Sequence, residues 1–334
     1  MSHDTEQSIK DRLEQLLSIG QALSAETDTT TLIEMILEGA RNLTNADAGT
    51  VYSVEEGDHL TFKTVHNDSL GLHLGGTSGT AVNFPSLPLY CEDGSPNEKN
   101  IAAYSAVSGK AVRIADAYAA EGFDFSGTRR IDAQTGYRSK SFLTVPMRDH
   151  EGSVIGVLQL INALDRQTGK AVEFTAADEK MACSLASQAA IALTKQSLID
   201  AQRELFNSFT QVIAKSIDRK NPTTGKHCER VPLLTMMIAD AINSAQNSAT
   251  AEFKLSPAEY DELSLAAWLH DCGKVTTPEA VINKATKLER QIDGIQEVMA
   301  RAAATRQEAQ IAALSKKHEH LAQGDTTSAD KAEL

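Results

Sequence analysis

The residues with the clearest chemical potential are an adjacent pair, His270 and Asp271, in the run WLHDCGK near the end of an apolar segment. Gly273 and Lys274 complete this run, and His227 stands upstream in the run DRKNPTTGKHCERV. Neutral imidazoles and a carboxylate together bind a transition metal firmly, and the two oxygens of an aspartate can bridge two ions. A hydroxide shared by two such ions is a nucleophile. Metal-assisted hydrolysis is therefore one chemistry open to these residue types.

Each of these residues also has an ordinary structural explanation when it is taken alone. An isolated His-Asp pair arises often by chance, and a histidine at the start of a helix is more often a solvated residue than a ligand. The combination of His227 with the His-Asp-x-Gly-Lys run is what favours a metal site. A site of this kind requires two separate helices to meet.

Two helices are predicted at the start of the chain, and antiparallel strands follow. Apolar residues recur at helical spacing over 9–23 and 31–43, and Thr31 with Glu34 forms a capping-box pattern. Alternating apolar residues then predict two β-hairpins, which cover 48–65 and 141–161.

The segment between the two hairpins, 70–139, is rich in Gly, Ser, Asn and Asp. It is predicted as long loops with short strands and one helix near 100–108. Antiparallel sheet with helices at both ends of its sequence indicates an α+β domain.

The rest of the chain is predicted to be helical. No Gly or Pro occurs from Thr175 to Asn221, so a single helix of about 65 Å is possible there. Beyond Pro222, amphipathic segments cover 230–242, 257–270 and 288–321. The polar tail is expected to fray.

The bulk properties limit the function classes. A chain of 334 residues, 41% hydrophobic and 23% charged, favours two globular domains. A net charge of −13 without a Lys/Arg cluster argues against a nucleic-acid polymer or an anionic membrane as partner, while a small nucleotide stays possible. Four scattered cysteines without a CxxC motif fit a reducing cytoplasm, and neither a signal peptide nor a membrane span is expected.

The first domain carries a recognisable pattern between 135 and 198. The runs TGYRSKSFLTVPM, VIGVLQLINA and FTAADEKMACSLASQAAIAL resemble the last two strands and the closing helix of a GAF domain. Four positions match the Asn-Lys-Phe-Asp-Glu signature of the GAF domains in cyclic-nucleotide phosphodiesterases: Asn162, Phe174, Asp178 and Glu179. Ala163 stands where that signature has its lysine.

The resemblance implies that these signature residues brace the domain behind a ligand pocket. The pocket is expected between one sheet face and the segment 70–139, and its ligand would be an unidentified small molecule. The candidate wall residues are Tyr104, Phe123, Phe125 and Tyr137. The alternative is that these aromatic residues are simply core.

The second half resembles the opening of an HD-GYP domain. The two runs around His227 and His270, followed by VTTPEAVINKATKL, are similar to its first two motifs and their connecting segment. This implies metal ligation by His227, His270 and Asp271, with Asp271 as the bridge. Lys274 would contact the scissile phosphate. The family reaction is hydrolysis of cyclic di-GMP, usually with iron or manganese.

The family's later motifs do not follow: its further histidines, a His-His-Glu run, Gly-Tyr-Pro and a late Asp. His318 and His320 lie in a charged segment and are not assigned to the metal. Three protein ligands leave too many open positions for a two-metal site, so weak metal binding and slow or no turnover are expected. The alternative to a regulated phosphodiesterase is a truncated or degenerate member that acts as a non-catalytic dimeric sensor.

Apolar stripes over 9–23 and 175–217 predict a homodimer held by a parallel helix bundle. The predicted architecture is an α+β GAF domain joined by a long signalling helix to an all-α HD-type domain. Its parts are an N-terminal helix over 1–27, the GAF domain over 28–198, a connecting helix over 199–221, a partial HD domain over 222–323, and a disordered tail over 324–334.

Overall fold

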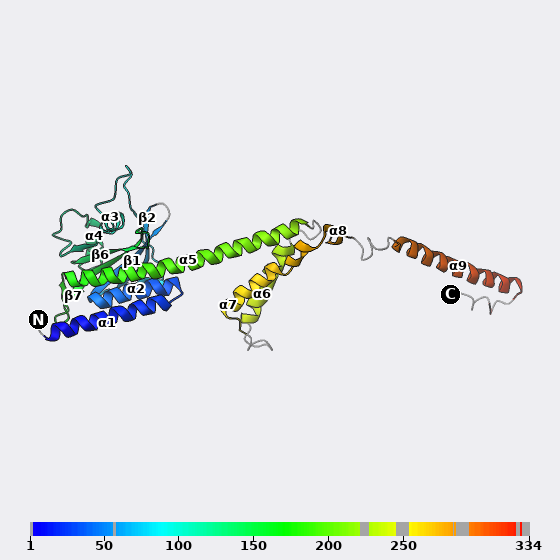
Figure 1. The fold of residues 1–334 in the computed structure, drawn as a ribbon, viewed down its shortest axis with the longest axis horizontal. Coiled ribbons are helices and arrows are strands. Elements are labelled where there is room, and N and C mark those ends of the chain that lie inside the picture. Colours follow the sequence, from blue (N-terminus) through cyan, green and yellow to red (C-terminus); the bar gives the residue numbers. More distant parts are fainter. Residues whose placement is uncertain are drawn as a thin grey trace. The chain divides into compact units, whose positions relative to one another are not determined.

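The computed structural model describes residues 3–55, 58–220, 227–244, 254–282, 284, 294–324 and 328 (Figure 1). The chain divides into two compact units, Met1–Arg203 and Glu204–Leu334. The predicted start of the last helix at Leu288, and most of the predicted tail, lie outside the described residues.

The first unit is built around an antiparallel sheet in the order β3-β2-β1-β7-β6-β5, with β4 paired to β2 and β8 paired to β7. The strands are β1 (Ala46–Glu55), β2 (His59–Asn67), β3 (Leu72–Gly75), β4 (Leu87–Pro88), β5 (Val112–Ile114), β6 (Phe142–Arg148), β7 (Val154–Leu164) and β8 (Ala171–Val172). Both predicted hairpins are present, as the pairs β1·β2 and β6·β7, and β1 joins them by pairing with β7.

Helices cover both faces of this sheet (Figure 1). One face packs on α1, α2 and the first part of α5. The other face packs on α3, with α4 nearby. The helices of this unit are α1 (His3–Ala25), α2 (Thr29–Thr44), α3 (Ile101–Ser108), α4 (Ser126–Thr135) and α5 (Ala176–Lys220), with a short 3-10 turn η1 (Gly76–Ser78).

Alternation along the central strands explains why the sheet is buried on both faces. Val51 and Leu158 enter the core beneath α1, α2 and α5. Their neighbours Tyr52 and Val157 enter a second cluster beneath α3. Because successive side chains of a strand point to opposite faces, a strand with two apolar sets must be covered twice.

Two details of the first unit differ from the sequence-based prediction. The cap of α2 is Asp28, whose Oδ1 accepts a hydrogen bond from the backbone N of Thr31 at 2.7 Å, so the predicted Thr31/Glu34 capping box is wrong. Glu34 instead accepts a hydrogen bond from the backbone N of Thr77 at 2.8 Å. The helix α4 lies within the segment that was predicted as loop, and helix 100–108 is present with Asn100 as its cap.

All secondary-structure elements in the described part of the second unit are helices. Its helices beyond α5 are α6 (His227–Ser244), α7 (Pro257–Leu269), η3 (Cys272–Thr276), α8 (Glu279–Ile282) and α9 (Ile295–Ala322). Ser256 caps α7 in a capping box with Glu259, and Pro257 occupies the first turn, where its missing N–H costs nothing. The predicted fold class, an α+β domain and a helical domain with a long helix between them, is confirmed. Among the residues that the structure describes, no helix is long and apolar enough to cross a membrane.

Candidate metal centre

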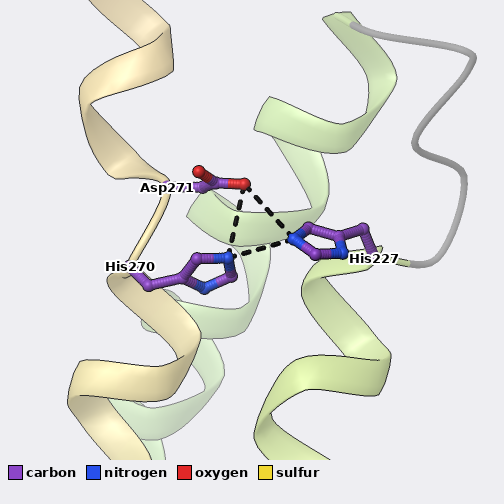
Figure 2. A group of neighbouring side chains, drawn as sticks. All are labelled: His227, His270 and Asp271. Carbon is purple, nitrogen blue, oxygen red and sulfur yellow. Dashed lines mark hydrogen bonds and ion pairs between the residues drawn. The ribbon is translucent and has the colours of Figure 1, made fainter.

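The histidines and the aspartate of the two sequence runs meet at one end of the α6–α7 pair (Figure 2). His227 is the first residue of α6, His270 follows the last residue of α7, and Asp271 precedes η3. The Nε2 atoms of the two imidazoles are 3.2 Å apart. Oδ2 of Asp271 lies 3.3 Å from the Nε2 of His270 and 3.6 Å from the Nε2 of His227. The three side chains therefore point at a common centre.

These separations are those of donors that share one cation. Ligands bonded at about 2.1 Å lie about 3.0 Å apart at right angles and about 3.4 Å apart at tetrahedral angles. The observed 3.2, 3.3 and 3.6 Å fit this range. The side chain of Asp271 is 20% exposed and that of His227 is 44% exposed, so the donors are open to water on one side. The residues present fit a divalent metal with further positions left for solvent or substrate.

The tautomer of His270 is set by its own helix. Its Nδ1 lies 2.7 Å from the carbonyl oxygen of Ala267, and because a carbonyl only accepts, Nδ1 carries the proton and donates it. The Nε2 of neutral His270 then presents a lone pair to the centre. This is the arrangement that orients an imidazole for metal binding.

Lys274 contributes the positive charge of the site. Its Nζ donates to Oδ2 of Asp271, the same oxygen that faces both histidines. Burial raises the pKa of Asp271, but the hydrogen bond and the charge of Lys274, together with the two histidines, outweigh burial and leave the pKa below its ordinary value. Asp271 is therefore a carboxylate at neutral pH.

Contacts at the opposite end hold α6 against α7. The hydroxyl of Tyr260 donates to Oδ1 of Asp240 at 2.8 Å. The backbone N of Leu255 donates to Oδ1 of Asn243 at 2.8 Å, and Nδ2 of Asn243 returns a bond to the carbonyl of Leu255 at 3.4 Å. These bonds fix the register of the two helices, and the register places His227 opposite His270.

The GAF signature residues lie in the first unit as internal braces. Asn162 is 3% exposed and has a left-handed backbone, with φ of 56°. Its Oδ1 accepts from the backbone N of Lys140 at 2.7 Å and of Ser141 at 3.2 Å. Its Nδ2 donates to the hydroxyl of Tyr137 at 2.9 Å and to the carbonyl of Arg138 at 2.8 Å. One side chain thus organises the segment that leads into β6.

The other signature residues fasten the start of α5. Phe174 is fully buried in the core beneath α1 and α2. Asp178 accepts from the backbone N and the hydroxyl of Thr175, at 2.8 and 2.7 Å, and pairs with Arg12 of α1. Glu179 pairs with Arg113 at 3.2 Å. With alanine at position 163, the cation beside Asp178 comes from α1, which sequence reasoning did not find because the two residues are 166 positions apart.

A cavity of about 480 Å³ lies between the α3 face of the sheet and the segment that contains α4. Of the four predicted wall residues, Phe125 and Tyr137 line it. Tyr104 and Phe123 are not among its lining residues and instead make an edge-to-face contact with a centroid separation of 5.5 Å. The hydroxyl of Tyr137 donates to Asp47 at 2.6 Å. Burial, and then this bond, raise the pKa of Tyr137 far above its ordinary value.

The sheet supplies lining residues that the sequence analysis did not single out. Tyr52 is 4% exposed, and its hydroxyl donates to Oε1 of Gln159 on the neighbouring strand at 3.0 Å. Thr50 and Phe62 also line the cavity. These residues alternate along their strands with residues of the opposite face. That alternation could have placed them on the cavity face from the sequence alone.

Comparison with known families agrees with the two units. The family model of the GAF domain matches residues 28–193, and that of the HD domain matches residues 224–331. The chain therefore belongs to the proteins that join a GAF domain to an HD domain, as the sequence motifs predicted.

Curated relatives include two phosphodiesterases. The dual 3',5'-cyclic-AMP and -GMP phosphodiesterase 11A of Takifugu rubripes is 29% identical over 191 residues, which are 57% of this chain and 19% of the relative. The dual 3',5'-cyclic-AMP and -GMP phosphodiesterase 11 of Drosophila melanogaster is 38% identical over 100 residues, 30% of this chain and 6% of the relative. The chain thus spans at most about a fifth of the length of these two proteins.

Among solved structures, GAF domains of phosphoenolpyruvate-protein phosphotransferases are similar to this chain. The one from Acinetobacter is 16% identical, covers 57% of this chain and 97% of its own, and has a TM-score of 0.41. The one from Coxiella burnetii is 14% identical, covers 57% and 96%, and has a TM-score of 0.43.

Proposed function

We propose that this chain is a GAF-regulated, metal-dependent phosphodiesterase of the HD-GYP type, with cyclic di-GMP as its substrate. The observation that carries the proposal is the convergence of His227, His270 and Asp271 within 4.8 Å of one another in the unit that matches the HD family. Iron or manganese is the proposed metal, because imidazole and carboxylate donors suit both.

Each residue of the site has a distinct role in this proposal. The two imidazoles and Asp271 hold the cation, and the carbonyl of Ala267 keeps the lone pair of His270 aimed at it. Lys274 supplies a positive charge for the phosphodiester, whose negative charge grows in the transition state. A divalent cation bound here would lower the pKa of a water and neutralise phosphate charge.

The regulatory part of the proposal concerns the first unit. A small molecule in the cavity lined by Tyr52, Phe125 and Tyr137 would act as the signal. A cytoplasmic location is also proposed, and the four free cysteines of the chain support it. The net charge of −13 supports a small nucleotide as the substrate, in preference to a nucleic-acid polymer or a membrane surface.

The test combines metal analysis of the purified chain with hydrolysis assays. Cyclic di-GMP, cyclic AMP and cyclic GMP are offered in parallel with Mn²⁺ or Fe²⁺, because the curated relatives are named for the two mononucleotides. His270→Ala and Asp271→Ala should lose bound metal and any hydrolysis. His318→Ala, which removes an exposed histidine of α9, should keep both. A chain that hydrolyses only cyclic AMP or cyclic GMP would contradict the proposed substrate.

A non-catalytic dimeric sensor is the second candidate. Among the described residues, His227, His270 and Asp271 form the single group of three or more potential ligands, fewer than a two-metal site needs. The helix α5 adds an apolar stripe with seven-residue spacing: Ile191, Leu198, Leu205 and Val212 are 64%, 62%, 71% and 59% exposed. Such a stripe suits a parallel two-helix association with a second copy.

Analytical ultracentrifugation tests the dimer. A dimer at micromolar concentration should become a monomer in Leu205→Glu, because a charge in an apolar seam is costly. Arg203→Glu, which changes charge at an exposed position two residues away, should leave the dimer intact. A wild-type monomer at that concentration would refute the association, and bound metal without hydrolysis of any of the three nucleotides would favour the sensor.

A further inference from the structure

The ammonium group of Lys274 and the two histidines all face the same oxygen atom, Oδ2 of Asp271. Lys274 donates to Oδ2 of Asp271, and that atom is also the nearest carboxylate oxygen to the Nε2 atoms of His227 and His270. The turn of η3 enforces this contact, since the backbone N of Lys274 donates to the carbonyl of Asp271 at 2.9 Å. Residues three apart eclipse each other in a 3-10 turn, so the two side chains lie side by side.

From this geometry we propose that Lys274 is an internal competitor for the metal. Its ion pair with Asp271 must open when a divalent cation binds, and the released ammonium is then free to meet an anionic phosphate. The inference rests on the proposed metal site and deepens it. It assigns to Lys274 a positioning role that depends on metal, in addition to the phosphate contact.

Electrostatics favours exchange over coexistence. A divalent cation and an ammonium on one carboxylate oxygen would be a few ångströms apart, and their repulsion is substantial even near the protein surface. The side chain of Lys274 is 34% exposed, so its flexible stem can move the charge into water at little cost. The imidazole of His270 has less freedom, because its Nδ1 is held by the carbonyl of Ala267.

If this exchange occurs, a substitution of Lys274 should have opposite effects on metal binding and on anion binding. Removing the ammonium should tighten metal binding, because nothing then competes for Asp271. The same change should weaken binding of an anion to the metal-loaded site. An ion pair that only stabilised the local fold would behave differently, since its loss would loosen the turn and weaken both.

The experiment measures Mn²⁺ affinity of the full chain by calorimetry and by the fluorescence of Trp268, the single tryptophan, two residues before His270. Lys274→Met should bind Mn²⁺ about two- to fivefold more tightly than wild type, because opening a partly exposed ion pair lowers an equilibrium constant by up to about fivefold. Lys274→Arg keeps the charge and should bind no more tightly than wild type. Lys316→Met, which removes an exposed lysine of α9 in the same unit, controls for the change in net charge.

A second arm uses inorganic phosphate as the probe on the Mn²⁺-loaded proteins. Lys274→Met should bind phosphate several-fold more weakly than wild type, and Lys316→Met should match wild type. Unchanged or weaker Mn²⁺ binding in Lys274→Met would overturn the competitor role, and so would an equal gain in Lys316→Met. If wild type and all variants are folded by circular dichroism yet none binds Mn²⁺ or Fe²⁺, the metal site itself is absent and the proposed function fails with the inference.

Discussion

Arg12 should be one of the most sensitive positions in the first unit, although it lies on a terminal helix. Its Nη2 donates to the carbonyl of Leu43 at 2.7 Å, at the end of α2, and pairs with Asp178 in the first turn of α5. The side chains of Arg12 and Asp178 are 21% and 10% exposed. One guanidinium therefore joins three helices.

The Arg12→Met substitution keeps most of the stem volume and removes the charge. It leaves the carboxylate of Asp178 with Thr175 as its remaining partner and the carbonyl of Leu43 without its donor. Breaking a fully buried ion pair costs about 3–5 kcal/mol, and the partial exposure here reduces the expected loss to roughly 2–3 kcal/mol. A loss of this size is a large part of the stability of an ordinary domain.

Urea unfolding of the full chain measures the effect. The far-UV transition of the first unit should move to lower urea, while the transition seen by Trp268 in the second unit should stay in place. Lys10→Met breaks an exposed pair on the same helix, with Glu14 at 3.9 Å, and should change stability by less than about 0.5 kcal/mol. If Arg12→Met and Lys10→Met lose the same stability, or if the effects of Arg12→Met and Asp178→Asn are additive, Arg12 does not join the three helices.

Three further changes test other parts of the structure. Burial and the charge of His73 lower the pKa of His66, and Glu34 acts in the opposite direction. As pH falls below 6.5, the unfolded chain therefore binds this proton before the folded chain does, and the stability of the first unit should decrease. Urea unfolding at several pH values should show a smaller decrease for His66→Gln. Phe174→Ala should destabilise the first unit by about 3–5 kcal/mol in thermal unfolding, because this ring is fully buried. Asn243→Ala should lower the free energy of unfolding of the second unit, followed by Trp268 fluorescence, by about 1 kcal/mol. An unchanged unfolding midpoint would mean that the amide does not hold α6 to α7.

Elements with a strong apolar period were predictable from the sequence. The hairpins β1·β2 and β6·β7 and the long helix α5 all follow from alternation or from the lack of breakers. The helix α4 had no such signal, since its one buried residue is Asp132, a polar one. Asp132 accepts from the hydroxyl of Tyr118 at 2.7 Å and from the backbone N of Ser139 at 2.8 Å, which are contacts made from outside the helix. Tertiary hydrogen bonds, invisible in a periodicity, fix this segment.

In the candidate metal site, too, some contacts were predictable from the sequence and others were not. The motif runs predicted His227, His270 and Asp271 as a group, and the structure places them together, because their residue types and spacing carry the signal. The contact between Lys274 and Asp271 required the turn geometry of η3, which no composition rule supplies. The Arg12 brace depends on a helix distant in sequence and could only be seen once the fold had brought it to α5.

The left-handed backbone at Asn162 restricts which amino acids a saturation-mutagenesis library would tolerate at this position. Glycine would accept the same φ without penalty, yet it would leave the backbone N–H groups of Lys140 and Ser141 unsatisfied in the interior. Aspartate would restore the acceptor and repel the carbonyl of Arg138, to which the amide now donates. Bulkier residues would be strained by the positive φ at this position. Selection for a folded first unit should therefore return asparagine alone, because the local backbone conformation sets this preference without any contribution from a ligand.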